Sequence, residues 1–384
     1  MAIDIADIID KLPPIRIPGL HSSDSIGIDI GSHSIKIVQL KNVSGKFQLI
    51  RWSVIPAIPV GETDKTESSP EEKKIFLVNL LKTYRGSGKN IPKNAVIAVS
   101  GTSVIVRYVK FQKLTRKELS KTIKAEAEPY IPFNVEEVYI GFHPLKDVTE
   151  EGKQKMETVL VAAKKDFVNQ RIEMIEESGF KPAIIDVDAF ALESSYELSL
   201  ENTTTNETVL IANIGYSKTN FVILENGVSV VVKDSPIAGN SINKNIMKTL
   251  GVDSRTAEKL KNSNGILLSI EEKEAALTQN QKEALAVSEA MTLLGKDLGN
   301  EIKKIIQYHI TQGKDKKIDR IILSGGSSNI KNFVNYLYKE LNISVEKLNL
   351  FSKILNSSGI PEEYQTTLAI ATGLAMRKPG DIND

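Results

Sequence analysis

The hydrophobic positions of this chain follow two spacings, and each spacing is typical of one kind of element. Apolar residues at alternate or successive positions predict strands within 26–40, 95–99, 104–111, 138–142, 158–163, 183–187, 209–224 and 321–323. Apolar residues three and four positions apart predict helices within 75–81, 115–131, 166–178, 281–310 and 366–376, with another from 189 onward. Strands that alternate with helices in this way predict an α/β layer architecture.

Local signals identify the buried side of several of these helices. The helix after 74 should bury Ile75, Leu77, Val78 and Leu81. Thr115 and Glu118 have the spacing of a capping box, and one face of the helix that follows carries Leu119, Ile123, Ala127 and Tyr130. The long helix should bury Val287, Met291, Leu294, Leu298, Ile302 and Ile305. Gly373 in the last helix is expected to face a neighbour that approaches closely.

Residues 1–24 precede the first predicted strand and form an N-terminal extension. Apolar residues could line one side of a short helix, namely Ile5, Ile8, Ile9 and Leu12, and the prolines that follow would end it. Two interpretations stay open: a flexible or surface-docked arm, and a helix that binds a partner or a membrane.

Two segments in opposite halves of the chain share one pattern. In the first, Asp29 ends an apolar run, Gly31 follows two positions later, and a hydroxyl-rich loop leads into a second apolar run. In the second segment, Asn213 and Gly215 take the corresponding places. Each pattern predicts a β-hairpin whose tip can surround an anion with backbone N–H groups and hydroxyls. Two such hairpins indicate two pseudo-equivalent domains that bind a polyphosphate between them, and ATP is the leading candidate.

Other motifs add candidate chemistry to this clamp. Asp29 needs a partner at the end of a buried strand, which a hydrated Mg²⁺ could supply, and Lys36 could reach a phosphate or lie on the surface. The Ser-Gly-Gly-Ser sequence at 324–327 follows a buried strand, so it could approach a flat ring or a phosphate, or form an ordinary turn. Of Asp186 and Asp188, one could cap the next helix while the other points at a water near a γ-phosphate.

Composition narrows the partners and the compartment. The 384 residues are enough for two or more domains, and the formal net charge of +1 gives no global field that would favour nucleic acid or anionic lipid. Cysteine is absent, which excludes disulfide scaffolds and thiolate metal sites. The first residues lack the pattern of a signal peptide, and no apolar stretch approaches the ~20 residues that span a bilayer. We therefore expect a cytoplasmic protein that meets a membrane only through partners.

The order of these motifs resembles that of the actin-like ATPase superfamily, which includes actin, sugar kinases, chaperone ATPase domains and FtsA. Its five sequence elements would correspond to 26–40, 183–195, 209–224, 320–330 and 366–377. A closer resemblance, over roughly 25–377, is to the PilM family of type IV pilus assembly proteins. It is carried by 27–40, by 124–133 with 136–139, and by 239–242 with 257–261, and the second of these stretches is the most specific.

The resemblance implies an actin-like ATPase fold with two RNase H-like lobes and the inserted small subdomain of FtsA and PilM. The first lobe would comprise 25–101, 183–205 and the C-terminal helix 364–377. The inserted subdomain would comprise 102–182. The second lobe would comprise 206–363, with a helical subdomain at about 239–312.

The resemblance also implies roles for individual residues. Mg²⁺ would be held by Asp29 and Asn213, and Asp188 would orient the attacking water. Phosphate contacts would come from Gly31, Ser32, Ser34, Lys36, Gly215, Ser217 and Thr219. Ribose, adenine and the rest of the nucleotide would meet Gly239, Glu258, Lys261, Gly325, Gly326 and Ser327. Asn213 stands where the superfamily usually has Asp, and an amide cannot replace the charge of a carboxylate at a metal, so we expect weak or absent ATPase activity.

By resemblance, the chain is an ATP-binding scaffold of type IV pilus assembly that associates peripherally with the inner membrane. Its main partner would be the N-terminal cytoplasmic tail of PilN, bound in a groove for which helix 116–131 is the candidate lining. Pilus motor ATPases, the platform protein and further copies of the chain in an oligomer or ring are additional candidate partners. Nucleotide would act as a state switch between two closures of the lobes.

Two alternatives use the same fold. A small-molecule kinase would need an acceptor pocket with a general base, whereas 102–165 is more typical of a docking subdomain. An FtsA-like division or filament protein would end in a membrane-binding amphipathic helix, whereas the C-terminal segment 378–384 is short and acidic.

Overall fold

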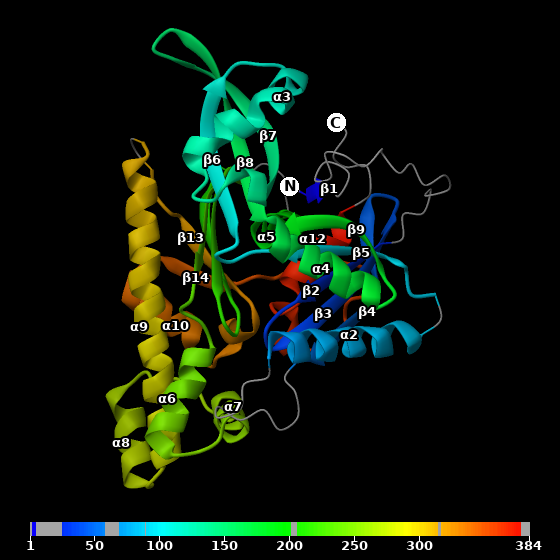
Figure 1. The fold of residues 1–384 in the computed structure, drawn as a ribbon. Coiled ribbons are helices and arrows are strands. Elements are labelled where there is room, and N and C mark those ends of the chain that lie inside the picture. The colour runs from blue at the N-terminus through cyan, green and yellow to red at the C-terminus, as the bar shows by residue number, and fades with distance from the viewer. Residues whose placement is uncertain are drawn as a thin grey trace.

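The structure is a computed structural model that describes residues 2–4, 25–57, 69–88, 90–200, 206–313 and 316–377. Its strands form three sheets, and helices pack against all of them (Figure 1). The helix considered for the N-terminal extension, lined by Ile5, Ile8, Ile9 and Leu12, lies outside the described residues.

The first sheet has six strands in the order β1-β9-β5-β2-β3-β4. Its members are β1 (Ala2–Asp4), β2 (Ser25–Ile30), β3 (Ser34–Val43), β4 (Lys46–Pro56), β5 (Asn94–Val99) and β9 (Lys181–Val187). β2, β3 and β4 form an antiparallel meander, while β2, β5 and β9 run parallel. β1 pairs antiparallel with β9 at the edge of the sheet.

Alternation of side chains along the strands of the first sheet decides which helices cover each face. On one face, Ile26 and Ile28 join a core with Leu81 of α2 (Pro70–Gly86) and Ile175 of α4 (Lys165–Glu177). The other face packs against α5 (Asp188–Ser199) and α12 (Ala369–Met376). The inserted subdomain was expected to end at 182, which would include α4. The apolar side of α4, however, packs on the first sheet.

Two glycines allow α12 to lie close to its neighbours. A Cβ on Gly27 would lie 2.2 Å from the carbonyl oxygen of Ala371, so β2 and α12 can touch only without that atom. A Cβ on Gly373 would lie 1.9 Å from the carbonyl oxygen of Ala191 in α5. The close approach expected at Gly373 is therefore confirmed.

The second sheet has five strands in the order β12-β11-β10-β13-β14. They are β10 (Thr208–Ile214), β11 (Thr219–Glu225), β12 (Val228–Ser235), β13 (Arg320–Ser324) and β14 (Ser344–Lys347). As in the first sheet, the first strand of the hairpin has a second partner that runs parallel to it, here β13 beside β10. One face of this sheet shares a core with α5, which also packs on the first sheet, so α5 lies between the two sheets.

Helices form the outer layer of the second sheet. They are α6 (Asn240–Leu250), α7 (Ser254–Ser263), α8 (Ile270–Thr278), α9 (Lys282–Thr311) and α10 (Phe333–Leu341). All six apolar residues predicted to be the buried side of the long helix are buried along α9. They pack with Ile242, Phe333 and the strand residues Leu210 and Phe221, which gives this layer a continuous core.

The third sheet is small and antiparallel, in the order β6-β8-β7 (Figure 1). It consists of β6 (Val104–Gln112), β7 (Val138–Glu150) and β8 (Lys153–Lys164), covered by α3 (Arg116–Ala127) and the short 3₁₀ helices η1 (Glu128–Tyr130) and η2 (Val135–Glu137). The capping box at Thr115 and Glu118 is present, and the buried face of α3 is as predicted as far as Ala127. Tyr130 was expected on that face but is 41% exposed, because the α-helix ends before Pro129 and η1 turns the side chain outward.

Ile75 was wrongly expected to be buried, and two segments near the C-terminus show details that no local pattern indicated. Ile75 is 52% exposed, since Val78 and Leu81 form the buried side of α2. The turn after β13 leads into the 3₁₀ helix η3 (Gly326–Asn329), and α10 begins only after Asn332, whose φ of +70° interrupts the helical path. The last helix is divided between α11 (Glu362–Gln365) and α12.

Candidate functional site

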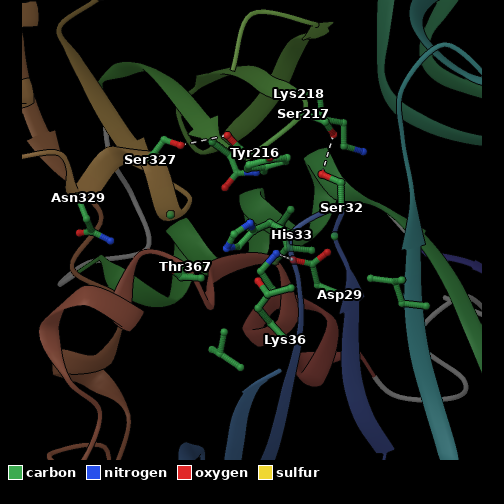
Figure 2. Close-up of a pocket in the computed structure, with 18 of the residues that line it drawn as sticks. Asp29, Ser32, His33, Lys36, Tyr216, Ser217, Lys218, Ser327, Asn329 and Thr367 are labelled. Atoms are coloured by element: carbon green, nitrogen blue, oxygen red, sulfur yellow. Dashed lines mark hydrogen bonds and ion pairs between the residues drawn. The ribbon is translucent and has the colours of Figure 1, made fainter. Parts of the chain in front are cut away.

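A cavity of about 900 Å³ lies between the two hairpin turns, with walls from both large sheets and from α7. Figure 2 shows the turn residues of both hairpins facing this space. The expected site residues that line it are Asp29, Gly31, Ser32, Ser34, Lys36, Asp188, Asn213, Gly215, Ser217, Glu258, Lys261, Gly326 and Ser327. Asp29 and Asn213, from opposite halves of the chain, therefore share one cavity.

Three expected site residues do not line the cavity. Thr219 is fully buried, and its hydroxyl donates a hydrogen bond to the carbonyl of Ile237 at 2.7 Å. Gly239 lies beneath the second turn, where a Cβ would be 2.2 Å from the Ser327 hydroxyl. Gly325 has a φ of +82°, and a Cβ there would be 2.5 Å from the carbonyl oxygen of Ile214. The two glycines therefore pack closely against neighbouring residues and do not face the cavity.

Both turns close in the same way. The Gly31 amide donates to the carbonyl of Ser34 at 3.2 Å, and the Gly215 amide donates to the carbonyl of Lys218 at 3.0 Å. A Cβ on Gly215 would lie 2.8 Å from that Lys218 oxygen, which explains the glycine without any positive φ. These two amides are therefore used within the turns, and the hydroxyls and lysines of the tips are additional groups that can bind an anion.

The tips of the two hairpins touch across the cavity. The Ser32 hydroxyl donates to the Ser217 hydroxyl at 2.8 Å, as Figure 2 shows. Beside this bond, the rings of His33 and Tyr216 lie with their centroids 4.9 Å apart. Burial lowers the pKa of His33, so its imidazole is neutral at pH 7. The two lobes are thus in a closed arrangement at this end of the cavity.

The first hairpin supplies one ion pair to the cavity. Lys36 returns along β3 and places its ammonium 3.1 Å from the carboxylate of Asp29 (Figure 2). β2 and β3 put the two residues directly opposite each other in register, so the pair follows from strand alternation.

Asp188 forms the centre of a contact between the lobes. Its carboxylate accepts hydrogen bonds from the Ser100 hydroxyl at the end of β5 and from the Lys218 ammonium at 3.0 Å. Burial opposes both charges, but their pairing outweighs it, lowering the pKa of Asp188 and raising that of Lys218. Asp188 begins α5 but does not cap it, and Asp186 is paired with Arg377, so the capping role considered for one of them is wrong.

Asn213 belongs to a chain of buried amides. It donates to Asn220 at 3.0 Å, Asn220 donates to Asp234 at 2.7 Å, and Asp234 also accepts the amide of Gly101 at 2.5 Å. Burial raises the pKa of Asp234. This chain is a second connection between the lobes, and it fixes the orientation of the Asn213 amide group.

The far wall of the cavity comes from α7. Glu258 pairs with Lys261 at 2.5 Å and accepts a hydrogen bond from Asn243 at 2.6 Å. Burial opposes ionisation of Glu258, but these partners outweigh it and lower its pKa. The Lys261 ammonium also lies 5.8 Å from the centre of the Tyr216 ring. A charged pair beside an aromatic ring can receive the polar edge and the flat face of a nucleoside.

Sequence reasoning missed several residues that line the cavity, the most important being Ser100, Arg171, His33, Tyr216, Lys218 and Asn220. Lys218 lies within the second hairpin motif, and a polyphosphate site predicts a cation there, so this signal was present. Ser100 and Arg171 come from β5 and α4, and no local pattern relates them to the hairpins.

The donors present fit a magnesium ion poorly. Among the described residues, no group of three or more His, Asp or Glu side chains could hold a metal ion. Asp29 is already paired with Lys36, and Asn213 offers one neutral oxygen. An ammonium about 3 Å from the same carboxylate repels a dication, so a metal would have to displace the lysine.

Two sheets that each begin with a glycine-tipped hairpin, with α5 between them and a polar cavity between the tips, define the actin-like ATPase fold. Solved structures agree with this fold. The PilM-PilN type IV pilus biogenesis complex matches with a TM-score of 0.73 and 22% identity, covering 92% of this chain and 98% of that chain. The ethanolamine utilization protein EutJ from Carboxydothermus hydrogenoformans matches with a TM-score of 0.50 and 11% identity, covering 97% and 93%.

The chain belongs to the family described as type IV pilus assembly protein PilM, whose profile matches residues 27–379. A cell division protein FtsA from Buchnera aphidicola subsp. Baizongia pistaciae (strain Bp) is 26% identical over 222 residues, which are 53% of this chain and 51% of that protein. The match thus spans about half of that relative. The expected fold and family are both confirmed. Within the described part of the chain, no helix has the length and apolarity that crossing a membrane requires.

Proposed function

We propose that this chain is a cytoplasmic, ATP-binding scaffold of type IV pilus assembly that is held at the inner membrane by the cytoplasmic tail of PilN. The observation that carries this proposal is the polar cavity between two glycine-tipped turns in a member of the PilM family. Its volume of about 900 Å³ is at the upper end of the range for sites that bury a drug-sized ligand, which suits a nucleotide.

In this proposal, the triphosphate lies between the two tips. Gly31, Ser32 and Ser34 with Lys36 would contact it from the first turn, and Gly215 with Ser217 from the second. The nucleoside would lie against the opposite wall, with Glu258 and Lys261 on one side and Gly326 and Ser327 on the other. Asp188 stands where it could orient a water, but its ion pair with Lys218 and the amide at Asn213 support weak or absent hydrolysis.

Nucleotide would then act as a state switch. The lobes meet through the bond between Ser32 and Ser217 and the pair between Asp188 and Lys218. A ligand between the tips must lengthen or replace these contacts. It therefore has different affinities for the closed and open arrangements, which is the requirement for a shift in population.

Calorimetric titration with ATP tests the nucleotide site. We expect Lys36→Met to weaken binding at least about tenfold, because a charge-assisted contact to phosphate is lost. Lys41→Met is the matched control, since Lys41 lies on the same strand, is exposed and does not line the cavity. Equal affinities for the two variants would contradict the placement of the triphosphate.

The PilN tail is proposed to dock on the inserted subdomain along α3 and η1. One of the similar solved structures is described as a complex with PilN, and this chain covers 98% of the matching chain. Tyr130 offers an exposed aromatic ring at the end of this surface, in edge contact with Phe111 at 6.1 Å. Exposed aromatics that are anchored from behind are common binding hot spots.

Fluorescence anisotropy with a labelled peptide of the PilN tail tests this docking. We expect Tyr130→Ala to weaken peptide binding at least about tenfold. Tyr308→Ala, which removes a 56% exposed tyrosine from α9 of the second lobe, should leave binding unchanged. A peptide that binds both variants equally well would show that the tail docks elsewhere, and a peptide that binds neither the variants nor the native chain would contradict the scaffold proposal.

A further inference from the structure

The charges around the cavity are arranged in lysine–carboxylate pairs. Lys36 pairs with Asp29 at 3.1 Å, Lys218 with Asp188 at 3.0 Å, and Lys261 with Glu258 at 2.5 Å. The pairs come from the first hairpin, from a contact between the lobes, and from α7. Each carboxylate that could ligate a cation in these three places therefore already has a cation beside it.

Lys218 holds an unusual position among these lysines. It occupies the turn between β10 and β11 and reaches across to Asp188 and Ser100 on the other lobe. Its pKa is raised by Asp188 despite burial, so the side chain is an ammonium at neutral pH. It is next in the chain to Ser217, whose hydroxyl accepts a hydrogen bond from Ser32 of the first turn.

Asn213 and Lys218 each make the cavity more positive than an Asp at 213 and a neutral residue at 218 would. The charged residues that line it are five cationic, Lys36, Arg171, Lys218, Lys261 and Lys331, and four anionic, Asp29, Asp188, Glu258 and Glu363. The lining therefore has a net charge of +1. With Asp at 213 and a neutral residue at 218, the same lining would be at −1 and would need a cation before it accepted a polyphosphate.

We infer that Lys218 supplies from the second hairpin the positive charge that a divalent cation would otherwise provide, so that this chain binds a nucleoside polyphosphate without a divalent cation. The inference rests on the proposed nucleotide site and deepens it. On binding, the ammonium of Lys218 turns from Asp188 to a phosphate oxygen, while Asp188 keeps the Ser100 hydroxyl as its donor. No covalent bond is made or broken in this exchange, which replaces one ion pair by another.

Calorimetric titration with ATP, in EDTA and separately in excess MgCl₂, tests the inference. For the native chain we expect dissociation constants that agree within about threefold in the two buffers, because the lysines replace the metal. Lys218→Met should weaken binding in EDTA at least about tenfold. Lys233→Met is the matched control: Lys233 lies on β12 of the same lobe, pairs with Glu301 at 2.6 Å and does not line the cavity.

A second variant works in the opposite direction. Asn213→Asp puts a carboxylate back into the cavity and should make binding dependent on magnesium, with an affinity at least about tenfold lower in EDTA than in MgCl₂. Thermal melting followed by circular dichroism establishes that each variant is folded before titration. If Lys218→Met does not fold, the comparison of the native chain with Asn213→Asp still decides the question.

The outcomes separate this inference from the function on which it rests. Native protein that binds ATP in MgCl₂ but more than about threefold more weakly in EDTA overturns the inference and leaves the nucleotide site intact. Equal losses for Lys218→Met and Lys233→Met also overturn it. No binding of ATP in either buffer overturns the nucleotide site, and the inference with it.

Discussion

Replacing Gly373 by alanine should destabilise the chain strongly, because the added methyl has no space. Its Cβ would lie 1.9 Å from the carbonyl oxygen of Ala191 and 2.6 Å from the carbonyl carbon, both backbone atoms of α5. Alanine is the better helix former by about 1 kcal/mol, whereas overpacking typically costs about 1–3 kcal/mol and occasionally more, and a methyl 1.9 Å from a backbone oxygen belongs at the upper end of that range or above it. We therefore expect the free energy of unfolding to fall by at least about 2 kcal/mol.

Gly299→Ala is the matched control for this substitution. Gly299 is also buried within a helix, but its nearest obstacle is the Cγ atom of the flexible Glu340 side chain at 3.0 Å. That side chain can move, so helix propensity should dominate and the control should be neutral or stabilised by up to about 1 kcal/mol. Urea unfolding followed by circular dichroism measures both variants. If Gly373→Ala were as stable as Gly299→Ala, the packing of α12 on α5 described above would be incorrect.

Three further predictions use other contacts. Arg377→Ala removes the guanidinium 2.8 Å from the fully buried Asp186, and urea unfolding should show a loss of about 3 kcal/mol, less for Arg377→Lys. Thr115→Ala removes the cap of α3 and should cost about 1 kcal/mol in the same assay, whereas Thr115→Ser should cost little. Burial lowers the pKa of His33, so folding releases its proton, and stability should fall as pH drops below 6.5; His33→Gln should flatten this slope between about pH 7.5 and 5.5, and an unchanged slope would contradict the role of His33.

The sequence predicted those parts of the fold that depend on local spacing. Residues on α9 that are three and four positions apart are buried as expected, because the period of an α-helix fixes which side chains share a face. The two hairpins followed from apolar runs broken by Asp29 and Gly31 and by Asn213 and Gly215. Tyr130 was wrongly predicted to be buried because the helical spacing was applied beyond Ala127, where the α-helix ends before Pro129.

The cavity depended on contacts that no local pattern contains. Ser100 meets Lys218 because β5 and the second hairpin end at the same space, although the two residues are far apart in the sequence. In the same way, α4 follows the inserted subdomain in the chain but packs on the first sheet through Ile175. Such contacts follow from topology, and a single sequence shows topology only through resemblance to a known fold.

The carbonyl oxygen of Gly215 joins the second turn to two other segments of its lobe. It accepts the amide of Gly239 at 3.0 Å and the hydroxyl of Ser327 at 3.1 Å, which occupies both of its lone pairs. The second turn is thereby tied to the start of α6 and to the loop after β13. A ligand that displaces this turn therefore pulls on the start of α6, and α6 packs on the 30-residue α9. The two bonds give a strain at the tip a direct mechanical route into the helical layer that covers the second sheet.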